Sequence, residues 1–155
     1  MRLVLDTLVV LMLLAILSGV MYHNRRIDEA HQQRELAREE LHRLQRQVHL
    51  QAALARVNQH ERAYPQTIDP AWFQGQLPRN PLLETDRPWL EVAGSSQRGL
   101  DHPEDVIAVS DETASFWYNP SAGIVRARVP SGISDAEALK LYNDVNGTNL
   151  TGLFK

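Results

Sequence analysis

The chain has 155 residues, no cysteine, a formal net charge of −3 and a pI near 6.0. This length leaves room for one compact domain beside an extended helix and excludes a second core. The charge balance argues against nucleic acid as a partner, and the lack of cysteine excludes disulfides and thiolate chemistry.

The segment from Leu3 to Met21 is apolar apart from three polar side chains, Asp6, Thr7 and Ser18. Its nineteen residues would span about 28 Å as a helix, close to the hydrocarbon thickness of a bilayer. Residues 1–22 are therefore predicted to form a transmembrane helix, with inner-membrane lipid as a partner. A cleaved signal peptide is the alternative, but Asp6 lies early in the segment and Leu17-Ser18-Gly19 is a poor cleavage site.

Asp6 is the most informative residue of this segment, because a carboxylate among apolar side chains costs a few kcal/mol unless it is relieved. One hypothesis is that its side chain simply reaches the interface. The other is that it pairs with the N-terminal amine or with Arg2 of an adjacent subunit during assembly.

Residues 22–62 contain no glycine and no proline, so the helix is predicted to continue to about residue 60, with 23–62 as an extended helix. Helical spacing places large apolar residues on one face, namely Leu41, Leu44 and Val48, and on the nearly opposite face, namely Leu50, Leu54 and Val57. Two apolar faces need two partners, and we expect the helix to pack against its own domain and against neighbouring helices. A single buried helix of an ordinary domain is the alternative that the periodicity leaves open.

Residues 63–155 are predicted to form a small α+β domain. Tyr64-Pro65 ends the helix, and the proline-rich stretch to Pro88 is expected to be an ordered loop because it carries several large apolar groups. Strands are expected in a small antiparallel sheet at 89–93, 106–110, 115–118 and 124–129, the last two joined as a hairpin.

Two local patterns in the C-terminal part add detail to this domain. Alternation in the last strand predicts a core face and a basic, solvated face, the latter formed by Arg126 and Arg128. Ser134 and Glu137 form a capping box, which predicts a short amphipathic helix ended by Gly147.

The sequence carries no nucleophile elbow, phosphate loop or zinc-helix motif, so no catalytic residue, metal site, cofactor or small-molecule substrate is predicted. Five of the six histidines lie on the long polar helix and are expected to be solvated, namely His23, His31, His42, His49 and His60. The predicted loops also carry a cluster of acids, namely Asp101, Glu104, Asp105, Asp111 and Glu112. These acids lack the glycine-punctuated spacing of a calcium loop, so solvated side chains are the favoured interpretation and calcium binding stays the alternative.

Three stretches together resemble type IV pilins and type II secretion pseudopilins. They are the apolar run LVLDTLVVLMLLAIL, the loop YPQTIDPAWFQGQLPRNPLL and the strand-turn-strand FWYNPSAGIVRARV. In this register Asp6 falls on the acid of the family's N-terminal helix and Arg2 on the first mature residue. Only Met1 precedes Arg2, so either the start codon is placed late or the chain is an uncleaved, divergent member without the usual leader.

The resemblance implies a non-enzymatic structural subunit of a type II secretion pseudopilus or type IV pilus, with other pilin-like subunits or envelope assembly proteins as partners. It also places the C-terminal domain in the periplasm, although Arg25 and Arg26 favour the opposite orientation. The alternative is a bitopic coiled-coil scaffold of the cell envelope, such as a division-complex component, with Leu41, Leu44 and Val48 as its seam.

Overall fold

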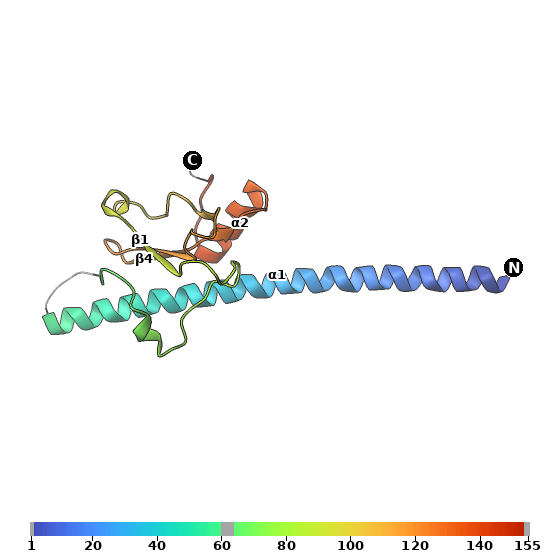
Figure 1. The fold of residues 1–155 in the computed structure, drawn as a ribbon, viewed down its shortest axis with the longest axis horizontal. Coiled ribbons are helices and arrows are strands. Elements are labelled where there is room, and N and C mark those ends of the chain that lie inside the picture. The colour runs from blue at the N-terminus through green and yellow to red at the C-terminus, as the bar shows by residue number, and fades with distance from the viewer. Residues whose placement is uncertain (1, 60–63, 154–155) are drawn as a thin grey trace. The chain divides into compact units, whose positions relative to one another are not determined.

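The computed structural model is an α+β chain (Figure 1), and it describes residues 2–59 and 64–153, with side chains in the first helix given for residues 11–56. The elements are α1 (Arg2–Gln59), η1 (Pro70–Phe73), β1 (Leu90–Val92), η2 (Ser95–Gln97), β2 (Ile107–Ala108), β3 (Phe116–Asn119), β4 (Ile124–Ala127), β5 (Val129–Pro130) and α2 (Asp135–Asn146). The chain divides into two compact units, residues 1–33 and residues 34–155.

Helix α1 is continuous from Arg2 to Gln59. The sequence of this stretch holds Gly19 but no proline, so no residue removes a backbone donor from the helix. The predicted long N-terminal helix is therefore confirmed. The compact unit begins at residue 34, within α1, whereas the domain was predicted to begin at residue 63, after the helix.

The predicted membrane crossing is wrong. In the part of the chain that the structure describes, no helix is both long and apolar enough to span a membrane. This finding overturns the transmembrane segment over 1–22, the transmembrane part of the fold class and the single-pass inner-membrane location with a periplasmic domain.

The main sheet has three strands in the order β1-β3-β4. Strand β3 is antiparallel to β4, with Phe116 opposite Ala127, as the hairpin predicts. Strand β1 is parallel to β3, with Leu90 opposite Phe116, so the expectation of an antiparallel sheet is wrong for this pair. The reason is the long connection over residues 93–115, which returns the chain to the end of the sheet where β1 begins.

That connection carries β2, which forms a separate two-stranded parallel sheet with β5. The predicted last strand is consequently divided, since β4 pairs with β3 and β5 pairs with β2. Helix α2 begins at the predicted capping box, in which Ser134 accepts from the Glu137 N–H, and ends at Gly147 in the left-handed conformation.

The core lies between one face of α1 and the β1-β3-β4 sheet. Its helix side consists of Ala37, Leu41, Leu44 and Val48, and its sheet side of Phe116, Tyr118, Val125 and Ala127, all buried. Each large side chain buried in this way stabilises the fold by about 1.5–3 kcal/mol. A second buried cluster joins α2 to the small sheet and comprises Val106, Val129, Ala138 and Tyr142.

The opposite face of the sheet is covered by the connection over 93–115 and is not solvated. Arg128, predicted to lie on a wet face, is 3 % exposed. Its guanidinium is fully used: Nε donates to the Asp105 carbonyl at 2.8 Å, Nη1 to the Ala114 carbonyl at 3.0 Å, and Nη2 to Glu91 Oε2 at 2.6 Å. The prediction of a solvated basic face is wrong for Arg128, because the loop supplies partners that strand periodicity does not reveal. Arg126 is half-buried, and its Nε donates to the Asp101 carbonyl at 3.0 Å.

Asparagine side chains satisfy the backbone where the chain is irregular. Asn80 donates to the carbonyls of Ser115 and Arg128, and buried Asn119 donates to the carbonyls of Arg98 and Leu100. These bonds replace a regular ladder, and they hold buried polar groups that would otherwise be costly.

The Tyr64-Pro65 junction rests on the β3–β4 hairpin. The Tyr118 hydroxyl donates to the Pro65 carbonyl at 2.6 Å, and burial raises the pKa of Tyr118. Gly123, in the hairpin turn at φ 67°, lies so close to Tyr64 that an added Cβ would overlap the tyrosine ring. The hairpin therefore needs glycine for both conformation and space.

We expect Gly123→Ala to lower the free energy of unfolding by about 3 kcal/mol, from left-handed backbone strain plus displacement of Tyr64. Gly132→Ala is the matched control, because Gly132 also has positive φ but open space around its Cα. It should cost about 1 kcal/mol, from strain alone. Urea unfolding measures both, and equal losses would contradict the steric role of Tyr64.

Arg128→Met is expected to lower the free energy of unfolding by about 2–3 kcal/mol, because two loop carbonyls and Glu91 lose their partner. Arg98→Met serves as the control, since the Arg98 side chain is exposed, and it should change stability by less than about 0.5 kcal/mol. Thermal unfolding followed by circular dichroism provides the comparison. A silent Arg128→Met would show that the loop is held without the guanidinium.

Candidate functional site

The residues predicted to mediate assembly all belong to α1. Arg2 and Asp6 lie within the helical backbone, but their side chains are outside the described residues, as is the side chain of Val57. The proposed pairing of Asp6 with a neighbouring subunit therefore stays a prediction.

Leu41, Leu44 and Val48 form the inward face of α1. They are 1 %, 0 % and 0 % exposed, respectively, and contact the sheet of their own domain. This face is fully occupied within one chain.

Leu50 and Leu54 lie on the other side of the helix and are 50 % and 46 % exposed. They are four residues apart, so they share one face of the helix, with exposed Ala53 beside them. We call these three residues the outer stripe. The structure thus separates the two predicted faces, one covered and one open.

The described residues of the unit 1–33 belong to α1, and the apolar side chains over residues 11–22 are exposed. Those more than half exposed are Leu11, Met12, Leu13, Leu14, Ile16, Leu17, Val20, Met21 and Tyr22. They surround the helix, because consecutive positions in a helix point in different directions. A helix that is apolar all round is normally covered by other structure.

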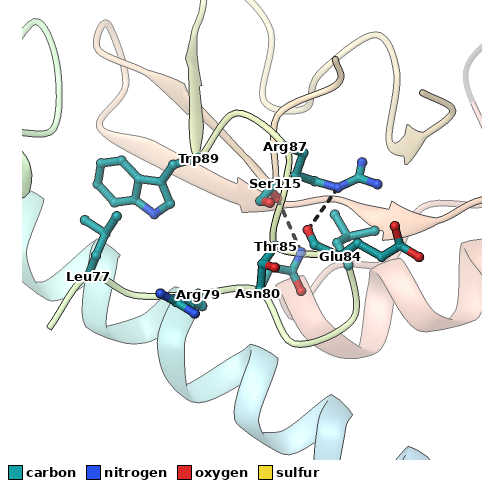
Figure 2. A pocket seen from close by; sticks show the side chains of 9 residues that line it. Leu77, Arg79, Asn80, Glu84, Thr85, Arg87, Trp89 and Ser115 are labelled. Carbon is teal, nitrogen blue, oxygen red and sulfur yellow. Dashed lines mark hydrogen bonds between the residues drawn. The ribbon is translucent and has the colours of Figure 1, made fainter. Parts of the chain in front are cut away.

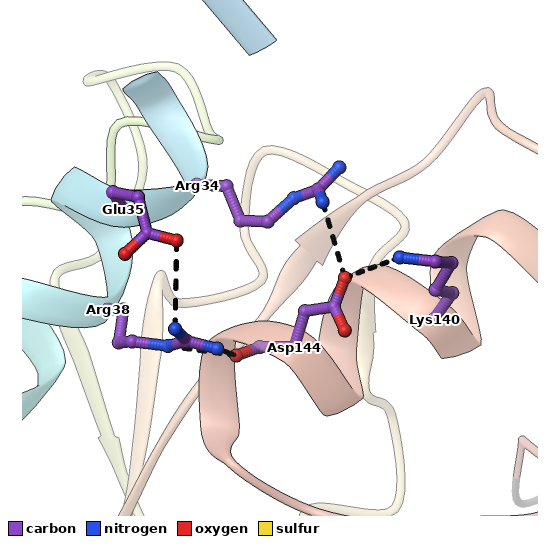
Figure 3. Close-up of polar contacts among 5 residues, drawn as sticks. All are labelled: Arg34, Glu35, Arg38, Lys140 and Asp144. Carbon is purple, nitrogen blue, oxygen red and sulfur yellow. Dashed lines mark hydrogen bonds and ion pairs between the residues drawn. The ribbon is translucent and has the colours of Figure 1, made fainter. Parts of the chain in front are cut away.

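A polar cluster joins the start of the compact unit to α2 (Figure 3). Arg34 Nη1 lies 3.3 Å from Asp144 Oδ2, which Lys140 Nζ also reaches at 2.7 Å. Arg38 donates from Nε to the Asp144 carbonyl at 3.1 Å, and its Nη2 donates to the same oxygen. Because Asp144 lies in the last turn of α2, these cations satisfy a helix-end carbonyl and oppose the negative end of the helix dipole.

A small pocket of about 170 Å³ lies at the start of β1 (Figure 2). Leu77 and Trp89 form one wall, and Arg79 lies beside them. The Trp89 indole is fixed by donation to the Pro78 carbonyl at 2.8 Å. Such a pocket is large enough for one apolar side chain but small for a whole substrate.

His102 and Tyr142 connect the segment over residues 93–115 to α2. His102 Nδ1 lies 3.0 Å from the Tyr142 hydroxyl, and burial is the main cause that lowers the pKa of His102 and raises the pKa of Tyr142. Both groups are therefore neutral near pH 7. Among the residues that the structure describes, no group of three or more histidines or acids is placed to hold a metal ion.

No protein-family model, curated protein or solved structure matches this chain. The likeness to pilins and pseudopilins therefore rests on the sequence stretches that carry it. The sequence did not predict the bonds of Arg34 and Arg38 to α2 or the burial of Arg128. All of these join residues far apart in the chain, and no local pattern indicates them.

Arg38→Gln should lower the free energy of unfolding by about 1 kcal/mol, because the Asp144 carbonyl loses a charged donor in a partly exposed setting. Arg46→Gln makes the same change at an exposed position of the same helix and should have an effect below about 0.5 kcal/mol. Urea unfolding at low salt compares the two variants. Equal effects would show that the bonds from Arg38 to α2 contribute nothing specific.

Proposed function

We propose that this chain is a non-enzymatic structural subunit of a pilin-like or pseudopilin-like filament, of the type II secretion or type IV pilus kind, and that subunits associate through α1. The observation that carries the proposal is the exposed apolar surface of this helix. Residues 11–22 and the outer stripe bury little of their apolar area within one chain, although such area favours burial.

The occupant that fits this surface is the α1 helix of a neighbouring pilin-like subunit, and a second copy of this chain is the simplest case. A helix with exposed apolar side chains over residues 11–22 and at the outer stripe can pack side by side with the same helix of other subunits, which would cover these two regions in every subunit. The covered inward face meanwhile keeps each domain folded on its own helix. The two faces of α1 thus support two separate roles.

A structural role is also consistent with the polar groups of the domain. Arg128, Asn80 and Asn119 spend their hydrogen bonds on loop carbonyls, and Arg38 on the end of α2. Polar groups committed to backbone partners contribute to rigidity, not to binding or proton transfer. This pattern supports a building block over an enzyme.

The coiled-coil scaffold is the less favoured function. Its seam would use Leu41, Leu44 and Val48, but these side chains already contact the sheet of their own domain. A coiled coil through this seam would have to uncover the core. The outer stripe carries no such conflict.

The test uses the absence of cysteine from the chain. Ala53→Cys introduces a single thiol between Leu50 and Leu54, and a short bismaleimide should join two copies there when α1 helices pack together. Adding Leu50→Glu and Leu54→Glu should reduce the cross-linked fraction about tenfold or more, because packing would bury two charges unpaired. The folded domain should be unaffected, since both leucines are exposed.

Val109 provides the matched control, because it is 68 % exposed but lies outside α1. Val109→Glu should leave the Ala53→Cys cross-link unchanged, and Val109→Cys should not cross-link. Failure of Ala53→Cys to cross-link, or equal yield with and without the two glutamates, would reject association through the outer stripe.

A further inference from the structure

Strand β1 forms an open edge of the main sheet. It is the outer member of the order β1-β3-β4, and Val92 is 37 % exposed. An open edge presents backbone donors and acceptors that another strand can pair with.

The hydrogen bonds between β1 and β3 determine which backbone groups of β1 face outward. Phe116 N–H donates to the Trp89 carbonyl at 3.0 Å and Ala93 N–H donates to the Tyr118 carbonyl at 2.8 Å, so residues 89, 91 and 93 bond toward β3. The N–H and C=O groups of Leu90 and Val92 consequently point to the open side. Within the described part of the chain, none of these four groups has a hydrogen-bond partner.

The other edge of the same sheet is closed by side chains. Asn146 accepts from the Ala127 N–H at 2.8 Å and donates to the Ala127 carbonyl at 2.9 Å, while Gln45 donates to the Val125 carbonyl at 3.3 Å. These residues take the place of a further strand along β4. The fold therefore caps one edge and leaves β1 available.

The pocket of Figure 2 continues this edge, because Trp89 in its wall directly precedes β1. Its apolar wall of Leu77 and Trp89 suits an aliphatic side chain. Arg79 beside that wall is exposed and has no ion pair or hydrogen bond among the described residues. An unpaired guanidinium at this position favours a carboxylate on the occupant.

We propose that β1 receives an extended segment of a partner protein as an added strand. The segment bonds to the outward groups of Leu90 and Val92, places an aliphatic side chain against Leu77 and Trp89, and presents an acidic residue to Arg79. Backbone pairing supplies affinity in this mode of recognition, and the side-chain pocket supplies specificity. This site lies on the sheet edge and is independent of association through α1.

The test uses the full chain and a short, capped, fluorescent peptide of alternating threonine and valine, with leucine at one valine position and aspartate two residues further on. Fluorescence anisotropy measures binding, and hydrogen exchange reports the amides of Leu90 and Val92. Binding should slow exchange at these two amides. Val92→Pro removes one outward N–H while leaving the bonds of residues 91 and 93 to β3, and should weaken binding about tenfold.

Val92→Ala is the control, because it shortens the same side chain but keeps the N–H, and it should bind within about threefold of wild type. A second comparison decides the matter if Val92→Pro does not fold. Arg79→Gln should weaken binding of the aspartate peptide about fivefold and leave an asparagine version unchanged. Absence of binding to wild type, undiminished binding by folded Val92→Pro, or an equal effect of Arg79→Gln on both peptides would each overturn the proposal.

Discussion

The burial of Arg128 is the constraint on which the rest of the domain depends. A three-stranded sheet has two faces to cover, and this chain has only one long helix to place on them. The second face is covered by the connection over residues 93–115, most of which forms no regular ladder. A segment of this kind is stable against a sheet only when side chains satisfy its backbone, and Arg128, which directly follows β4, does so while pairing with Glu91 on β1.

Helix α1 couples the fold to the proposed assembly. Its inward face completes the core, to which the helix contributes Ala37, Leu41, Leu44 and Val48. Its outer stripe and the apolar residues 11–22 remain uncovered, and apolar area of this kind is what drives association between subunits. In the proposed filament one helix would therefore serve two partners, because Leu44 and Leu50 lie on different faces of α1.

The two edges of the main sheet differ in whether side chains bond to their outward backbone groups. Asn146 belongs to α2 and reaches both backbone groups of Ala127, so the last helix protects β4 while it packs. Asn146 is therefore buried and unavailable for glycosylation, although it begins the sequon Asn146-Gly147-Thr148. No equivalent side chain among the described residues reaches the outward groups of β1, and this asymmetry singles out β1 as the edge open to a partner.

Features that depend on residues close together in the chain could be predicted from the sequence. Helix α1 followed from a stretch without proline, α2 from the capping box of Ser134 with Glu137, and the β3–β4 hairpin from two strands around a short turn. The inward and outer faces of α1 also followed, because helical periodicity alone separates Leu44 from Leu50. The predicted membrane span is wrong, because no helix in the described part of the chain is both long and apolar enough to cross a membrane.

Features that depend on contacts between distant segments could not be predicted in this way. The parallel pairing of β1 with β3 depends on where a long connection returns, and strand patterns do not encode direction. Arg128 alternates with core residues as a solvated side chain would, yet it is buried, because carbonyls of Asp105 and Ala114 come to it from a distant loop. The same holds for the bonds of Arg38 to α2 and for the open groups of Leu90 and Val92. Hydrogen bonds between segments far apart in the chain leave no periodic trace in sequence, so they become visible only when the chain is folded.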